Sequence, residues 1–243
     1  MSAVGRRKIW RDVMQAKSQY ASIAMMVALG IAFLIGAYSV YQNLDGSYRQ
    51  SYDKLRFEDF SIRFNSAPQR VTDRIRALPG VLAAEGRLVE ETALELPGRA
   101  TGKLVGRLIG IPTHRPLKVN QLKIVAGRMV RPNAREVLIE AEFAEHHRLR
   151  PGDEVVAERL SSRLPLRIAG IVQSDEYLYV VRSKQELIAM PDTFGVMFAD
   201  EDVLGGLFRK PGEINEIHAL VADPARTPAT MALTKRALRA YEP

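Results

Sequence analysis

The sequence predicts an α+β protein, in which one N-terminal transmembrane helix precedes a mixed domain with a β-rich insertion. Two observations carry this prediction. The first is a run of twenty uncharged residues near the N-terminus, at positions 21–40. The second is the order of the segments that follow. Strand-like and helix-like patterns alternate, give way to several short strand-like segments, and then alternate again.

Composition excludes several classes of function. The chain has 243 residues, of which 47% are hydrophobic and 26% are charged, as is typical of folded proteins. It contains no cysteine, which excludes disulfides, zinc–thiolate sites and cysteine nucleophiles. The net charge of +7 is concentrated at the start, where residues 1–41 hold five basic residues and one acidic residue. Because the rest is nearly balanced, we expect no nucleic-acid partner.

The apolar segment Ala21–Val40 has the length of a membrane span. As a helix it covers about 30 Å, which is the thickness of the hydrocarbon core. Tyr20, Tyr38 and Tyr41 lie at its two ends, where tyrosine rings favour the membrane interface. A cleaved signal peptide is the alternative, although its apolar region is usually shorter, about 7–15 residues. The sequence therefore predicts a transmembrane helix at 20–41.

Basic residues predict the orientation of this span. Five of them precede it within the first nineteen positions, so the short N-terminal tail is expected in the cytoplasm. The main domain is then periplasmic or extracellular, and the chain is a single-pass protein of the bacterial inner membrane. Residues 1–19 predict an amphipathic helix on the cytoplasmic surface, with one apolar face against membrane lipids: Ile9, Trp10, Val13 and Met14.

Small residues recur every four positions within the span and form one stripe: Ala24, Ala28, Ala32 and Gly36. Such a stripe lets a second helix approach closely, so we predict a helix-packing face. The alternative interpretation is that alanine and glycine are simply common in membrane spans.

The first β-α-β unit follows a polar helical extension at 42–56. Alternating apolar residues predict a strand over Phe57–Phe64, and a helix is expected over Pro68–Leu78. Pro79 ends this helix, because its ring clashes with the preceding turn and it has no N–H to donate. A second strand is expected over Val81–Leu88.

Short strand-like segments separated by turns predict the β-rich insertion, together with one helix at Ala141–His147. The strands are expected at Thr92–Leu96, Leu104–Ile111, Val137–Ile139, Val155–Leu160 and Leu166–Val172. A second series follows: a strand at Gly195–Phe198, a helix at Asp200–Leu207 capped by Asp200, a strand at Ile214–Val221 and a helix at Pro228–Tyr241. The exported domain, 57–243, is thus divided into 57–96 plus 190–243, and an insertion at 97–189.

No motif predicts catalysis, a cofactor or a metal ion. Gly98–Leu104 resembles a phosphate loop, but three residues instead of four separate its glycines and Leu104 has no hydroxyl for magnesium. His146 and His147 are adjacent, so they point to different sides of a helix, and His114 and His218 are distant in sequence. Asp175-Glu176 is expected to be a solvated turn. We therefore do not expect an enzyme.

Several short motifs, in a fixed order, resemble one family. They are FEDFSI at 57–62, LPGV at 78–81, GRLV at 86–89, LIGI at 108–111, Gly127-Arg128, EVLIEAEFAEHHRLRPGDEV at 136–155, IAGIVQSDEYLYVV at 168–181 and Asn215-Glu216-Ile217. Together with the preceding span, this order resembles the MacB-like periplasmic core domain of ABC transporter permeases, the group that contains MacB, FtsX and LolC/LolE.

The resemblance implies a ferredoxin-like (β-α-β) porter part at 57–96 and 190–243 with an inserted β-rich subdomain. It also implies a separate ABC ATPase subunit, a second permease copy or homologue, and a periplasmic partner. The permease relays ATPase-driven motion for export or extraction of a substrate such as a lipid, lipoprotein or peptide. Family permeases carry three further spans, so the chain corresponds to their N-terminal part. The alternatives are a stand-alone membrane-anchored periplasmic binding or adaptor module, and an extracytoplasmic enzyme.

Overall fold

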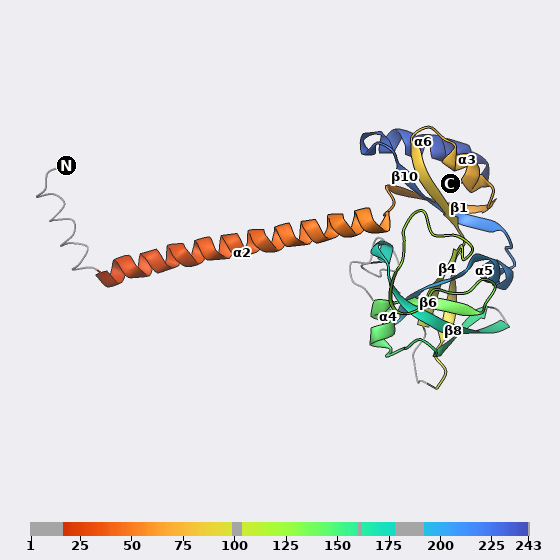
Figure 1. The fold of residues 1–243 in the computed structure, drawn as a ribbon, viewed down its shortest axis with the longest axis horizontal. Helices are drawn as coiled ribbons and strands as arrows, with labels where there is room; N and C mark the ends of the chain where they lie inside the picture. Colours follow the sequence, from red (N-terminus) through yellow and green to blue (C-terminus); the bar gives the residue numbers. More distant parts are fainter. Residues whose placement is uncertain (1–16, 99–103, 160–161, 178–191, 243) are drawn as a thin grey trace, which may run out of the picture. The chain divides into compact units, whose positions relative to one another are not determined.

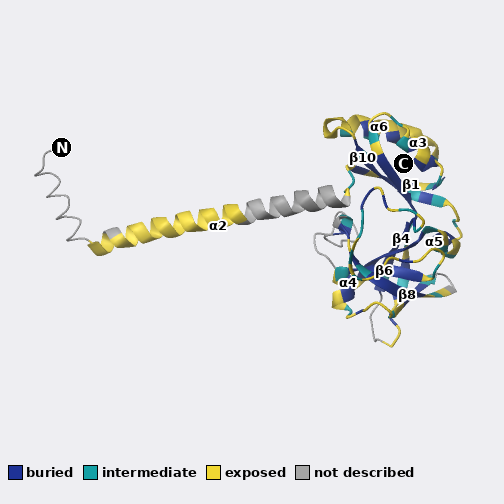
Figure 2. Ribbon diagram, viewed as in Figure 1, coloured by how far each residue is buried: buried dark blue, intermediate teal, exposed yellow. Residues whose placement is uncertain are grey.

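The computed structural model describes residues 17–98, 104–159, 162–177 and 192–242, and the chain forms two units, Met1–Ser51 and Tyr52–Pro243. The first described element is α2, Lys17–Leu55, a continuous helix of 39 residues (Figure 1). Its segment Lys17–Ser39 is long and apolar enough to cross a membrane, and none of it is buried against the rest of the chain (Figure 2). α2 therefore contains the expected span and continues through most of the expected polar extension.

A three-stranded antiparallel sheet, here called the small sheet, has the order β1-β10-β2. Its strands are β1 (Phe60–Pro68), β2 (Val81–Arg87) and β10 (Glu213–Val221). Helix α3 (Val71–Arg76) connects β1 to β2, and α6 (Thr227–Leu238) follows β10. Because β10 lies between β1 and β2, the β1-α3-β2 unit is a split β-α-β unit. The strands of the small sheet and the helices α3 and α6 pack around one apolar core, which includes Phe60, Ile62, Val71, Ile75, Ile217 and Leu238.

The larger sheet closes into a barrel. Its order is β5-β8-β6-β9-β4-β3-β7, and β7 pairs back to β8, so six strands form a ring to which β5 is attached. The strands are β3 (Val89–Glu95), β4 (Leu104–Ile111), β5 (Lys123–Gly127), β6 (Glu136–Glu140), β7 (Glu154–Arg159), β8 (Ser162–Gln173) and β9 (Phe194–Asp200). Closure leaves few free strand edges in this sheet.

Two short helices cover the barrel: α4 (Ala141–His146) and α5 (Glu201–Phe208). The carboxylate of Asp200 caps α5 by accepting from the N–H groups of Asp202 and Val203, each at 3.1 Å, which confirms the expected cap. Short 3₁₀ turns complete the architecture: η1 (Asp175–Tyr177), η2 (Pro224–Arg226) and η3 (Arg239–Tyr241).

Several expected elements are confirmed and others shift. β4 occupies Leu104–Ile111 as expected. The helix expected at Pro68–Leu78 begins only at Val71, because Pro68 still pairs with Glu213 as part of β1. Proline is tolerated there because β1 is an edge strand and needs no N–H on its free side. β5 was not expected; it is a strand of only five residues that lies at the end of the strand order and pairs with β8.

The division between the two sheets differs from the expected boundaries. β3 pairs with β4 and β7, and β9 pairs with β4 and β6, so both belong to the barrel and not to the small sheet. The barrel strands thus span residues 89–200, a wider range than 97–189. Every residue of β9 is buried, and a strand that is buried on both faces carries no signal for which sheet it joins.

Candidate functional site

The predicted packing stripe, Ala24, Ala28, Ala32 and Gly36, lies on α2 and is exposed along its length. A Cβ placed at Gly36 would meet nothing within 4 Å. The role of the stripe stays a prediction. The predicted lipid-facing residues, Ile9, Trp10, Val13 and Met14, lie outside the described residues.

The polar face of the small sheet forms the most unusual site in the structure. Side chains alternate along a strand, and here the apolar set faces α3 and α6 while the opposite face is charged. Glu85, Arg87, Glu216 and His218 on that face are all buried. Charges removed from water need partners. The partners come from the residues before β1 and from barrel segments that include η1.

Arg87 is the largest fully buried side chain of this face. Its Nη1 donates to Oε2 of Glu176 at 2.8 Å, and Nη2 donates to the carbonyl oxygens of Val119 at 3.1 Å and Asn120 at 3.3 Å. Burial acts to lower the pKa of Arg87, but the nearby acidic groups, chiefly Glu176, raise it overall. The expectation of a solvated turn at Asp175-Glu176 is wrong for Glu176, whose side chain is 12% exposed and neutralises a buried guanidinium.

His218 is buried between two carboxylates. Its Nδ1 contacts the carboxylate of Glu58, and its Nε2 lies 3.2 Å from Oε2 of Glu216. Burial disfavours the charged imidazole, yet the carboxylates of Glu176, Glu58 and Glu216 raise the pKa of His218 to about 10. Burial also opposes ionisation of Glu216, but its contacts with His218 and Arg63 lower its pKa to about 2. His218 is therefore an imidazolium that donates both of its N–H groups.

Glu58, Glu176 and His218 place possible metal-ligand atoms within 4.8 Å of one another. The orientation of the Asn120 side-chain amide disfavours a metal ion at this position. Its Oδ1 accepts from the Glu58 N–H at 2.9 Å, which turns Nδ2 towards Glu176 at 2.9 Å and towards the Glu58 carboxylate. Donor hydrogens thus fill the space where a cation would bind, and Arg87 adds a positive charge beside it. The donor set fits an ion-pair network and not a metal centre.

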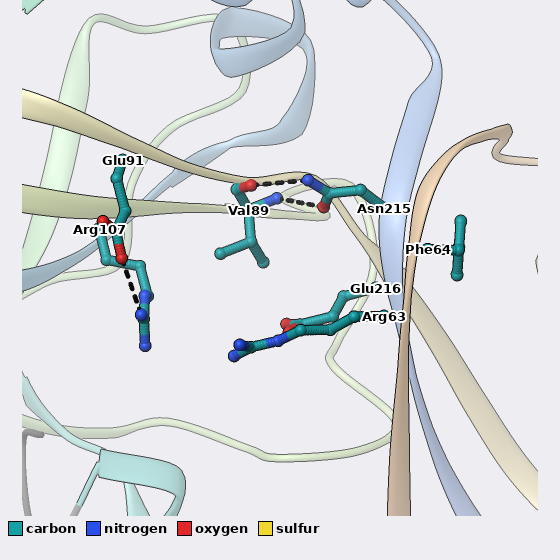
Figure 3. A pocket seen from close by; sticks show the side chains of 7 residues that line it. All are labelled: Arg63, Phe64, Val89, Glu91, Arg107, Asn215 and Glu216. Carbon is teal, nitrogen blue, oxygen red and sulfur yellow. Dashed lines mark hydrogen bonds and ion pairs between the residues drawn. The ribbon is translucent and has the colours of Figure 1, made fainter. Parts of the chain in front are cut away.

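A cavity of about 200 Å³ lies at the edge of the junction between the small sheet and the barrel (Figure 3). Its walls include Asn215, whose amide joins the two bodies. Oδ1 accepts from the Val89 N–H at 2.8 Å, and Nδ2 donates to the Val89 carbonyl oxygen at 2.7 Å. Arg107 donates to Glu91 at 2.8 Å, and Arg63 pairs with Glu216, so the charged groups drawn in Figure 3 are already paired.

The Asn215-Glu216-Ile217 motif therefore has a structural explanation. The Asn215 amide replaces one peptide unit in bonding to β3, and Glu216 binds both Arg63 and His218. Ile217 points the other way, into the core of the small sheet. Three consecutive residues thus serve the junction, the ion network and the core.

The Gly127-Arg128 motif holds the barrel together. Gly127 has φ +76°, and a Cβ at this position would lie 2.4 Å from the carbonyl oxygen of Ala169. Arg128 and Arg131 donate to the carboxylate of Glu136 at 2.6–2.8 Å, and these bonds hold the pKa of Glu136 well below its ordinary value. The motif supports the approach of β5 to β8 and contributes no reactive group.

Comparison with solved structures finds similar domains. The extracellular domain of the noncanonic ABC-type transporter YknZ from Gram-positive bacteria is 16% identical, with a TM-score of 0.49 over 72% of this chain and 82% of that one. The periplasmic region of MacB from Actinobacillus actinomycetemcomitans is 12% identical, with a TM-score of 0.49 over 73% and 74% of the two chains. No curated protein sequence matches the chain.

The family model described as the MacB-like periplasmic core domain matches residues 23–237, which is most of the chain. This family is a domain of transporters rather than of enzymes. The domain is periplasmic or extracellular, and the apolar helix before it has the features of a membrane anchor or of a signal sequence. The chain belongs to the MacB-like periplasmic core domain family and is the periplasmic core domain of a MacB-like ABC transporter.

Proposed function

We propose that the chain is the N-terminal part of a permease subunit of the MacB/FtsX/LolC-LolE type, with α2 as its first transmembrane span. One observation carries this proposal: the family match begins inside α2, at residue 23, and continues through the whole domain to residue 237. A span retained in the mature protein places the N-terminus in the cytoplasm of a bacterial cell and the core domain outside the inner membrane.

Its work is mechanical. A separate ABC ATPase subunit supplies energy on the cytoplasmic side, and the core domain transmits the resulting motion to a substrate such as a lipid, lipoprotein or peptide, with a periplasmic partner. The length of α2 supports this view. A helix of 39 residues is about 58 Å long, roughly twice the hydrocarbon core, so one rigid element can link the two sides.

The small-residue stripe is the proposed packing face of the span. Ala24, Ala28, Ala32 and Gly36 let another helix approach, whereas the large apolar residues around them, such as Met26 and Phe33, suit lipid. The neighbouring helix belongs to a second permease copy, to a homologue, or to the rest of the permease. In the domain, the split β-α-β of the small sheet supports its role as the ferredoxin-like porter part, and the barrel is the inserted subdomain.

Cysteine accessibility tests the topology, because the natural chain has no cysteine. We would place single cysteines at Ser2 and at Lys235, which is exposed on α6, and treat intact spheroplasts with a membrane-impermeant maleimide. Labelling is expected at position 235, and at position 2 only after lysis. Loss of the N-terminal residues from the mature protein would instead identify α2 as a cleaved signal sequence.

Co-purification of an ABC ATPase with the chain tests the partnership, and its absence would favour the stand-alone binding or adaptor module.

A further inference from the structure

The small sheet and the barrel have separate apolar cores. Among the described residues, the buried cluster of the small sheet contains no residue from a barrel strand. The two barrel clusters contain none from a strand of the small sheet. Since no buried apolar cluster of these described residues joins the two bodies, polar groups hold them together. Polar interfaces within a chain are typical of bodies that move relative to each other.

Three contacts, two ion pairs and one amide–carboxylate contact, hold the polar face of the small sheet against the barrel, and we call them the latch. The first is the Arg87–Glu176 ion pair described above. The second is the bidentate pair of Arg115 with Glu85, whose carboxylate also accepts from the Lys118 N–H at 3.1 Å. The third joins Asn120 to Glu58, which belongs to the small sheet because the adjoining Asp59 N–H donates to Ala219 of β10.

The chain crosses between the two bodies at two places, which we call the pivot. Leu88 is the single residue between β2 and β3, and residues 209–212 connect α5 to β10. Arg209 and Gly212 both have positive φ, at 57° and 68°, so the second crossing is a tight turn. Asn215 bonds to Val89 beside the first crossing and keeps the two connections together.

We propose that the small sheet turns about the pivot as one body and that the latch is the contact that opens and closes. Opening leaves both apolar cores intact and returns the latch charges to water, so the main cost is lost pairing and not exposed apolar surface. Partial opening leaves the fully buried guanidinium of Arg87 without the carboxylate of Glu176, which is strongly unfavourable. The movement is therefore two-state. This inference depends on the geometry of the junction and not on the identity of the substrate.

Distances between spin labels test the proposal directly. Labels on Lys235→Cys in α6 and Lys123→Cys in β5 report the separation of the two bodies, and both positions are exposed. A second pair, Lys123→Cys with Glu154→Cys, reports the barrel alone. The full chain is measured in detergent by double electron–electron resonance. With Arg115→Ala and Asn120→Ala combined, a second population at longer distance is expected for the first pair and no change for the second pair.

The matched control is Arg163→Ala, which removes an exposed ion pair within the barrel and leaves the latch intact. It should reproduce the distances of the natural sequence. Where the combined variant does not fold, Arg115→Ala alone replaces it, because that side chain is partly exposed. An unchanged distance for the first pair in a folded latch variant would overturn the proposal. Equal broadening of the pair within the barrel would overturn it as well, since this result means unfolding instead of a turn about the pivot.

Discussion

Raising the pH should weaken the folded domain through a single residue, His218. Its pKa is about 10 in the folded chain, against an ordinary value of 6.5. The folded state therefore holds this proton more tightly than the unfolded state. The stabilisation is fully present below pH 6.5 and is lost as the pH rises towards 10. Glu58, Glu216 and Glu176 face the imidazole and favour the proton, while Arg87 beside Glu176 opposes it.

The magnitude follows from the pKa difference. Each unit corresponds to about 1.4 kcal/mol, and His218 is fully buried, so solvent screens the interaction little. Between pH 7 and pH 9 the free energy of unfolding should fall by about 2–3 kcal/mol, slightly less than the equivalent of two full pKa units, because the unfolded histidine is still partly charged at pH 7.

Urea unfolding of the full chain in mild detergent, followed by near-ultraviolet circular dichroism, measures this effect. His218→Gln should lower stability at pH 7 by about 3–5 kcal/mol, because it removes one partner of a buried ion pair. The same variant should also lose most of the pH dependence. His146→Gln, on the exposed side of α4, is the matched control and should keep both the stability and the slope. Equal slopes for the natural sequence and His218→Gln would refute the assignment of a charged histidine at the junction.

Three further predictions concern the membrane helix, the junction and the barrel. Ala28→Leu should weaken association of the span with its partner helix but still allow insertion into the membrane. Met26→Leu, on the opposite face of the helix, should leave this association unchanged. Equal co-purification of the partner helix with both variants would count against the stripe. Asn215→Ala should lower the free energy of unfolding, measured in urea, by about 1–3 kcal/mol, because it leaves the backbone N–H and carbonyl oxygen of Val89 unpaired. Asn65→Ala, at an exposed position, is the control and should lower this free energy by less than about 0.5 kcal/mol. Gly127→Ala should lower the free energy of unfolding more than Gly98→Ala does. Both glycines have positive φ, so both substitutions add a backbone strain of about 1–2 kcal/mol, but only at Gly127 would the new Cβ lie against the carbonyl oxygen of Ala169. Equal losses of stability would contradict this close approach.

Local patterns explain what could be predicted about the fold. The uncharged run at 21–40, the apolar segment of β4, the Asp200 cap and the helix between β1 and β2 depend on neighbours within a few residues. Their periodicity and end signals are therefore visible in the chain itself. The ordered motifs that resembled the MacB-like family also follow the linear sequence, and the family match confirms them.

The junction could not be predicted in this way. Glu176 meets Arg87 across 89 positions, and Glu58 meets His218 across 160, so neither pair leaves a local pattern. Charged residues next to tyrosines usually indicate a solvated turn, and only the packing of η1 against the small sheet buries Glu176.

The sequence by itself determined an apolar helix, the approximate positions of most strands and helices, and membership of a transporter family. Only the tertiary structure decided which sheet β3 and β9 join, that β7 closes on β8, and that the charged face of the small sheet is a buried ion network. The physical reason is that alternation shows which side of a strand is apolar, whereas strand pairing and the burial of polar faces depend on contacts between residues far apart along the chain.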